Sequence, residues 1–183
     1  MSRGRLVRLA LLAAVAVALL VLRFTTRFGA SLSTTHIREV VQHAGAAGIG
    51  VFVVAFCVGE LLHVPGLVFV GAAVLAWGRL AGGAAAYVGA LVAVSVAFAV
   101  VRAIGGQPLG EIRQPRLRAV LARLEQRPIG TIAVLRLFLW LAPALNYALA
   151  LSPVRYRDYV AGSAIGLVIP VAAATTLLEY LLR

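Results

Sequence analysis

The stretch VLRLFLWLAPALNYALALSP, residues 134–153, carries one arginine, two prolines and one asparagine among fourteen apolar side chains. No acidic residue lies near Arg136 in the sequence. Placing an unpaired guanidinium deep in a membrane costs at least about 2.5 to 3.5 kcal/mol. If this stretch lies in a membrane, Arg136 therefore needs a carboxylate, carbonyl groups, water or a phosphate as its partner.

Apolar residues dominate the whole chain. Of its 183 residues, 62% are hydrophobic and 13% are charged, whereas about a quarter are charged in soluble domains. This composition predicts an all-α integral membrane protein. The 17 basic residues, all arginine, outnumber the 6 acidic ones. Because the arginines mostly lie between apolar segments, they indicate membrane topology and anionic membrane lipids as partners, and not nucleic acid.

Residues 1–43 are predicted to form an N-terminal transmembrane helix and a polar linker at the membrane surface. A basic start is followed by a largely apolar stretch at residues 6–22. The alternative is a cleaved signal peptide, which is disfavoured because residues 18–31, ALLVLRFTTRFGAS, offer a poor cleavage site.

The rest of the chain, residues 44–183, is predicted to form one membrane domain of two similar halves. Repeat one covers 44–105 and repeat two covers 129–183. Between them, residues 106–128 form a basic cytoplasmic loop. Within that loop, an amphipathic helix at 115–126 has Leu117, Val120, Leu121 and Leu124 on one face.

Each half contains a proline-marked break between apolar segments that are too short to cross a membrane. The apolar piece at 67–77 would rise only about 16 Å as a helix, against a hydrocarbon layer of about 30 Å. Pro65, Gly66 and Pro143 are the predicted breaks of two re-entrant hairpins, because proline lacks the N–H of the helical ladder. The alternative is that these prolines only kink ordinary helices.

The two halves resemble an inverted repeat of hairpin plus spanning helix. Aligning Pro65 with Pro143 brings Gly82 near Gly162 and Gly89 near Gly166, within two residues. With the N-terminus in the cytoplasm, eleven arginines fall inside and five outside, which favours this multi-pass topology in the cell (inner) membrane. The hairpin tips would then meet near the midplane. The residues predicted to pack spanning helices closely are Gly78, Gly82, Gly89, Gly162, Gly166 and Pro170.

Four polar residues are candidates for a transport pathway: Glu60, Arg136, Asn146 and Arg102. Glu60 lies in the first arm of the first predicted hairpin, and Arg136 lies in the equivalent arm of the second. Two hypotheses stay open for them. They form either a structural ion pair between the repeats or a cavity pair that binds an anionic group or a proton. For Arg102, the alternative to a transport role is a cation at a helix end whose side chain reaches towards the membrane surface.

His63 and Asp158 are candidates for a proton relay. Glu60 and His63 have the Glu-x-x-His spacing of carboxylate metal sites, but the second half has no counterpart, so no metal site is predicted. For Asp158, which follows two arginines, a local ion pair or helix cap is the alternative.

The single cysteine, Cys57, excludes an intramolecular disulfide. No cofactor is expected, and no nucleophile or phosphate-loop motif indicates an enzyme.

Two sequence blocks resemble the DedA and VTT (SNARE-associated Golgi protein) superfamily over about residues 45–175. The first begins at VPGLVFVG, residues 64–71, includes Trp77-Gly78, and closes with Phe98, Arg102 and Gly105. The second lies within residues 135–170. Its matching residues are Arg136, Leu137, Pro143, Asn146, Gly162, Gly166 and Pro170.

The resemblance implies two re-entrant hairpins that face each other and a role in moving lipids. Bacterial members are implicated in proton-linked flipping of polyprenyl-phosphate carriers, and eukaryotic relatives in scrambling phospholipids. Leu67 stands where the DedA branch tends to have an acid, and Asn146 where a second arginine would be expected. These differences favour the VTT branch.

The leading functional hypothesis is therefore a lipid transporter or scramblase. One alternative is a proton-coupled transporter of a small solute or ion. Another is a non-transporting membrane scaffold, which would dock partners on the helix at 115–126. A homo-oligomer is compatible with the sequence.

Overall fold

The computed structural model describes residues 47–106, 122–140 and 142–182, together with residues 39 and 43. These ranges contain helices and turns and no β-strand, which confirms the predicted all-α class. The predicted N-terminal transmembrane helix and most of the amphipathic helix at 115–126 lie outside the described residues. The main helices are α4 (Gly48–Leu61), α5 (Gly66–Gly105), α7 (Pro128–Leu139), α8 (Pro143–Leu151) and α9 (Tyr156–Leu182).

The first break separates α4 from α5. Helix α4 ends at Leu61, and His63 has a positive φ of 59°, which stops the right-handed helix. Pro65 then precedes the first helical residue of α5, Gly66. The chain therefore leaves the helical conformation between Leu61 and Gly66, next to the predicted break at Pro65 and Gly66.

Helix α5 is 40 residues long but is not one straight rod, because Gly78 has non-helical angles, φ 74° and ψ 178°. A Cβ atom added to Gly82 would lie 2.3 Å from the carbonyl oxygen of Ala73. In a straight helix, nine residues would separate these two positions by about 13.5 Å. The chain therefore turns back at Gly78, and residues 79–105 run against residues 66–77.

The second break separates α7 from α8 and has the same elements as the first. Trp140 has a positive φ of 45°, and Pro143 is the first residue of α8, where a missing N–H costs nothing. After α8, a short turn leads into α9, which contains Pro170. Each half of the domain therefore consists of a helix, a break, a short helix and a longer helix.

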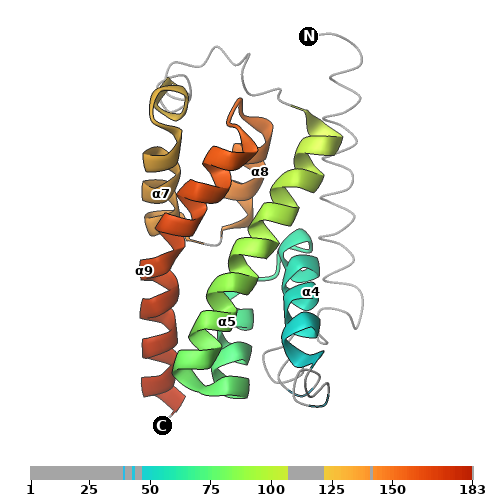
Figure 1. The fold of residues 1–183 in the computed structure, drawn as a ribbon, viewed down its shortest axis with the longest axis vertical. Helices are drawn as coiled ribbons and strands as arrows, with labels where there is room; N and C mark the ends of the chain where they lie inside the picture. The colour runs from blue at the N-terminus through green and yellow to red at the C-terminus, as the bar shows by residue number, and fades with distance from the viewer. Residues whose placement is uncertain (1–38, 40–42, 44–46, 107–121, 141, 183) are drawn as a thin grey trace.

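Figure 1 shows how the two halves fit together. Helix α5 packs against α4, α8 and α9, and α7 packs against α9. Helices α4 and α7 approach the middle of the long axis from opposite ends, and their breaks lie there. Among the described helices, α5 and α9 are long and apolar enough to cross a membrane, as judged by length and composition.

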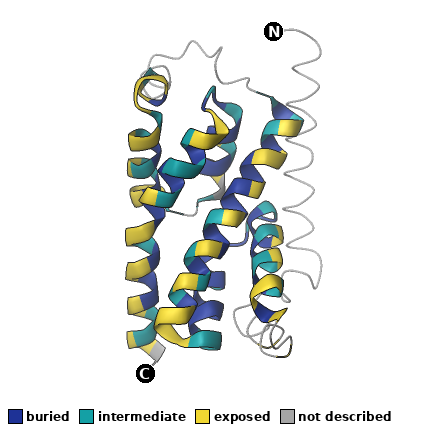
Figure 2. Ribbon diagram, viewed as in Figure 1, coloured by how far each residue is buried: buried dark blue, intermediate teal, exposed yellow. Residues whose placement is uncertain are grey.

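A row of alanines on α5 is buried, and larger apolar side chains on α5 and α7 are exposed. On α5, Ala86, Ala90 and Ala93 are fully buried, whereas Val88 is 53% exposed. Phe138 on α7 is 79% exposed, and exposed positions run along the outer faces of most helices (Figure 2). Small residues at helix contacts and apolar ones outside are typical of helices that pack in lipid.

Three further glycines lie at close helix contacts. Gly89 of α5 lies against the ring of Phe52, and Gly162 and Gly166 of α9 lie against α7. A Cβ on Gly166 would lie 2.6 Å from that of Arg136, so this glycine lets α9 approach the arginine closely. Gly78 differs from the packing role predicted for it. A Cβ there would meet nothing within 4 Å, and its role is the backbone turn.

Candidate functional site

Arg136 lies on the last turn of α7 and is completely buried. Its guanidinium donates hydrogen bonds to four acceptors: the Asn146 Oδ1 atom, Tyr159 Oη at 2.6 Å, the Trp140 carbonyl at 3.0 Å and Ser163 Oγ at 3.3 Å. All four acceptors are uncharged. The hydrogen-bonding capacity of the guanidinium is largely used, but its positive charge is not neutralised by a direct contact.

Asn146 of α8 connects Arg136 to Glu60. Its carbonyl oxygen accepts from Arg136, and its amide nitrogen donates to the Glu60 carboxylate on α4. Glu60 and Arg136 themselves form no direct ion pair. The ion pair considered from the sequence is therefore replaced by an amide between the two charges, at the point where the two breaks meet.

Tyr159 of α9 brings α5 into the same network. Its hydroxyl accepts from Arg136 and lies 2.9 Å from Asn146 Oδ1 and 3.0 Å from the Val94 carbonyl oxygen on α5. Its ring packs on Phe98, with the ring centroids 4.2 Å apart. The polar network thus contains a group from each of α4, α5, α7, α8 and α9.

One oxygen of Glu60 is unused by this network. Glu60 is 1% exposed, and its Oε2 atom has no hydrogen-bond partner in the described part of the chain. A buried polar atom without a partner is rare, and it requires an explanation. A water or a cation would satisfy it, whereas a bound proton would remove the negative charge and turn this oxygen into a hydrogen-bond donor.

Arg102, near the end of α5, binds the backbone that follows α8. Its guanidinium donates to the carbonyl oxygens of Ala150, Ser152 at 2.7 Å and Val154 at 3.0 Å, and it lies 4.6 Å from the centre of the Phe98 ring. These carbonyls include ones that the end of a helix leaves without a partner. The side chain is partly buried and is held by these backbone carbonyls. It does not touch Arg136.

The two predicted proton-relay residues lie in different surroundings. His63, in the first break, stacks on Tyr147 of α8, with centroids 4.9 Å apart. Asp158, in the first turn of α9, forms an ion pair with Arg155 at 3.3 Å. No group of three or more His, Cys, Asp and Glu residues among the described ones could hold a metal ion.

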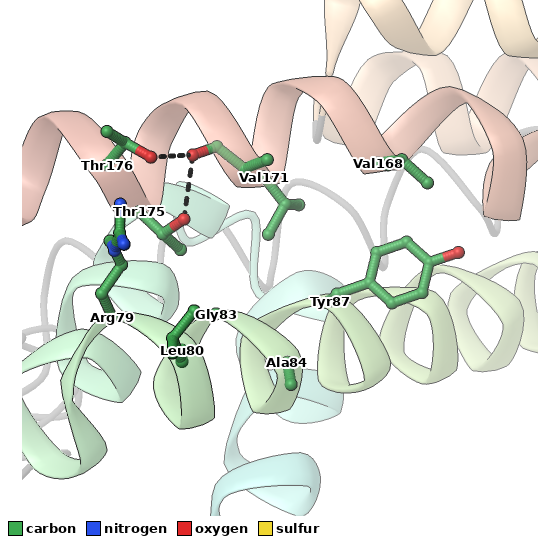
Figure 3. Close-up of a pocket in the computed structure, with 10 residues that line it drawn as sticks. Arg79, Leu80, Gly83, Ala84, Tyr87, Val168, Val171, Thr175 and Thr176 are labelled. Atoms are coloured by element: carbon green, nitrogen blue, oxygen red, sulfur yellow. Dashed lines mark hydrogen bonds between the residues drawn. The ribbon is translucent and has the colours of Figure 1, made fainter.

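A groove of about 500 Å³ lies between α5 and α9 (Figure 3). None of its lining residues belongs to the Arg136 network. Arg79 lies at one end and forms an ion pair with Glu179, which lies beside the lining residues, with 2.9 Å between Nε and Oε2. Its lining residues are Arg79, Leu80, Gly83, Ala84, Tyr87, Val168, Val171, Ala172, Thr175 and Thr176.

A model of the VTT domain family matches residues 64–180, well over half of the chain. The chain belongs to the VTT domain family. No curated protein and no solved structure matches it. VTT domains generally occur in membrane proteins of the DedA type, which agrees with the two helices long enough to span a membrane.

The matched VTT domain holds most of the network but not all of it. Arg136, Asn146 and Tyr159 lie inside it, whereas Glu60 lies before its first residue. The α4 helix nevertheless packs on α5 and places Glu60 against Asn146. The site is thus built from the VTT domain and the helix before it.

Tyr159 and Ser163 were missed by the sequence-based prediction. They are four residues apart and therefore lie on one face of α9, the face that meets Arg136. Two hydroxyl-bearing residues at this spacing in an apolar helix of a VTT domain were the available clue. Nothing in the sequence indicated that their partner is Arg136, which lies 23 and 27 residues away from them along the chain.

Proposed function

We propose that this VTT domain protein is a lipid transporter or scramblase of the cell membrane, which moves phospholipid or polyprenyl-phosphate head groups between leaflets. The observation that carries the proposal is the guanidinium of Arg136, which is completely buried and bonded to uncharged acceptors. A lipid phosphate would supply the negative charge that these acceptors lack, and its oxygens would replace some of them as hydrogen-bond partners of the arginine. Arg136 would attract the phosphate, and Glu60 and Asn146 would line its path.

The proposed path runs between two re-entrant hairpins related as an inverted repeat. In support, α4 and α7 reach the middle of the long axis from opposite ends, and Asn146 binds Glu60 across the two breaks. Broken backbone at membrane depth is tolerated only inside protein or beside a water-filled cavity. A head group that crosses there travels through a short polar zone instead of the full hydrocarbon layer.

The proposed orientation places the N-terminus and the basic loop at 106–128 in the cytoplasm, where arginine-rich segments are usual and anionic lipids attract them. In this orientation, Arg102 and Arg155 lie on the inner side and Arg79 lies on the outer side. Two contacts support it. Arg102 binds the segment just before Arg155, and Arg79 binds Glu179 near the end of α9.

The test is translocation of a fluorescent phospholipid in liposomes that contain the purified protein. Wild type should exceed empty vesicles, and Arg136→Gln should fall to the rate of empty vesicles. Arg157→Gln, which removes an exposed arginine of α9, is the control for loss of charge and should retain the wild-type rate. Monodisperse elution and thermal unfolding confirm that each variant is folded.

Two outcomes would contradict the proposal. If folded wild type does not exceed empty vesicles with either a phospholipid or a polyprenyl-phosphate lipid, the chain is not a lipid scramblase. If Arg136→Gln is folded and as fast as wild type, Arg136 has no part in the path.

The free oxygen of buried Glu60 favours a second candidate, a proton-coupled transporter of a small solute or ion. Glu60→Gln retains an oxygen that accepts from Asn146 but removes the carboxylate. In this variant, uptake driven by a pH gradient should be abolished. Neither wild type nor Glu60→Gln should move lipids between leaflets. Uptake that keeps its dependence on the gradient in Glu60→Gln would exclude the carboxylate as the coupling group.

A further inference from the structure

We propose that the groove between α5 and α9 is a binding site for one phosphatidylethanolamine molecule, with its head group at Arg79 and Glu179. The site is separate from the Arg136 network and does not depend on transport. It requires only that α5 and α9 lie in a membrane, as expected for a VTT domain.

The charged end of the groove lies at the level of lipid head groups. Arg79 follows the turn at Gly78, and Glu179 lies close to the end of α9. Their side chains are 46% and 29% exposed, and the neighbouring Tyr180 is 79% exposed. Tyrosines and charged residues at helix ends are typical of the interface between lipid and water.

The pair of charges matches a zwitterionic head group. The phosphate would accept hydrogen bonds from Arg79, and the ammonium group would donate to Glu179. Because a partly exposed ion pair contributes little stability, it can open around a ligand at little cost. An anionic phosphatidylglycerol head group would satisfy Arg79 but would offer Glu179 no positive charge.

Two threonines add acceptors beside these charges. The hydroxyl groups of Thr175 and Thr176 both donate to the Ala172 carbonyl, at 3.0 and 2.8 Å (Figure 3). What they offer to the groove is therefore oxygen lone pairs. A primary ammonium can donate hydrogen bonds to such oxygens, whereas the trimethylammonium of phosphatidylcholine has no N–H. The groove should therefore favour ethanolamine over choline.

The remainder of the groove suits an acyl chain. From Arg79 to Tyr87, α5 rises about 12 Å, over a third of a hydrocarbon layer of about 30 Å. This part is lined by Leu80, Ala84 and Val168, together with other small or apolar residues. In Figure 3, Ala84 lies between the two ends of the groove, so a large side chain there would fill the space for the chain.

The test is native mass spectrometry of the full-length protein in detergent with equal amounts of phosphatidylethanolamine, phosphatidylcholine and phosphatidylglycerol that share the same acyl chains. Wild type should retain one phosphatidylethanolamine in preference to the other two. Arg79→Gln should lower that retention about tenfold, the loss expected for a charge-assisted contact. Ala84→Phe should also lower it, because the ring would fill the space for the acyl chain. Ala99→Phe, at an exposed position of α5 outside the groove, should retain the lipid as wild type does.

Equal retention of the three lipids by wild type would overturn the proposal, because the head group would not be recognised. Unchanged retention in both Arg79→Gln and Ala84→Phe would also overturn it, because the bound lipid would lie elsewhere. Arg79 is on the surface, so its variant stays informative even if Ala84→Phe fails to fold. Since the readout is binding, a protein that moves no lipid can still confirm the site, and an active scramblase can still refute it.

Discussion

Asn146 joins Glu60 to Arg136: its amide nitrogen donates to the glutamate, and its carbonyl oxygen accepts from the arginine. Replacing it by leucine would leave a buried carboxylate and a buried guanidinium each without this partner. We expect Asn146→Leu to lower the free energy of unfolding by roughly 2 to 4 kcal/mol. Thermal unfolding in detergent would measure the change. Ala148→Leu, at an exposed position of the same helix, should leave the unfolding temperature nearly unchanged.

The Tyr159 hydroxyl is predicted to hold Arg136 in place relative to α5. Tyr159→Phe keeps the ring on Phe98 but removes the contacts to Arg136 and to the Val94 carbonyl. The expected loss of stability is about 1 to 2 kcal/mol. Tyr156→Phe is a close control, since Tyr156 also packs near Phe98 but is 49% exposed. If the two variants unfold at the same temperature, the hydroxyl does not stabilise the network.

Arg102 is predicted to fix the end of α8 through the fork shape of its guanidinium. Lysine keeps the charge but cannot reach several carbonyls at once in this fixed geometry. Arg102→Lys should destabilise the protein by about 1 to 3 kcal/mol and speed amide hydrogen exchange in residues 149–155. The control is Arg123→Lys, an exposed arginine, which should change neither quantity. Unaltered exchange in Arg102→Lys would show that positive charge alone is sufficient.

The turn at Gly78 depends on close packing at Gly82. An added methyl group at Gly82 would collide with the backbone of Ala73 and Val74, which cannot move easily. Gly82→Ala should therefore destabilise the protein by about 1 to 3 kcal/mol. Gly130→Ala, in a helical position with open space around it, should instead stabilise by about 0.5 to 1 kcal/mol. Opposite shifts in unfolding temperature would confirm the distinction, and a stabilising effect at Gly82 would contradict the fold-back.

The helix class and the positions of the breaks could be predicted because they depend on local chemistry. The missing N–H of Pro65 and Pro143 acts on the adjacent backbone, whatever the rest of the chain does. The sequence alone could not show that Gly78 forms a backbone turn whereas Gly82 lies at a close helix contact. Both lie in a glycine-rich stretch, and only the three-dimensional contacts distinguish a backbone turn from a close helix contact.

The polar residues of the site could be predicted from the sequence, but the hydrogen bonds that connect them could not. Arg136, Glu60 and Asn146 stand out because polar groups are rare in apolar segments. Their connection through an amide depends on a contact between residues 86 positions apart. Arg102 illustrates the same limit, since its acceptors are 47 to 52 residues away along the chain. No local sequence pattern predicts which backbone carbonyls Arg102 will bind.

The separation between Glu60 and Asn146 also sets a waiting time during biosynthesis. At about 5 to 20 residues per second, a ribosome makes Asn146 roughly 4 to 17 seconds after Glu60. Until then, the carboxylate lacks the amide that holds it in the finished protein. Since hydrocarbon solvates a charge poorly, the Glu60 side chain is more stable at the membrane surface, against the insertion machinery or in its protonated form until Asn146 is made. If α4 and α8 lie in a membrane, the contact between them can form only after the second half of the domain has been synthesised.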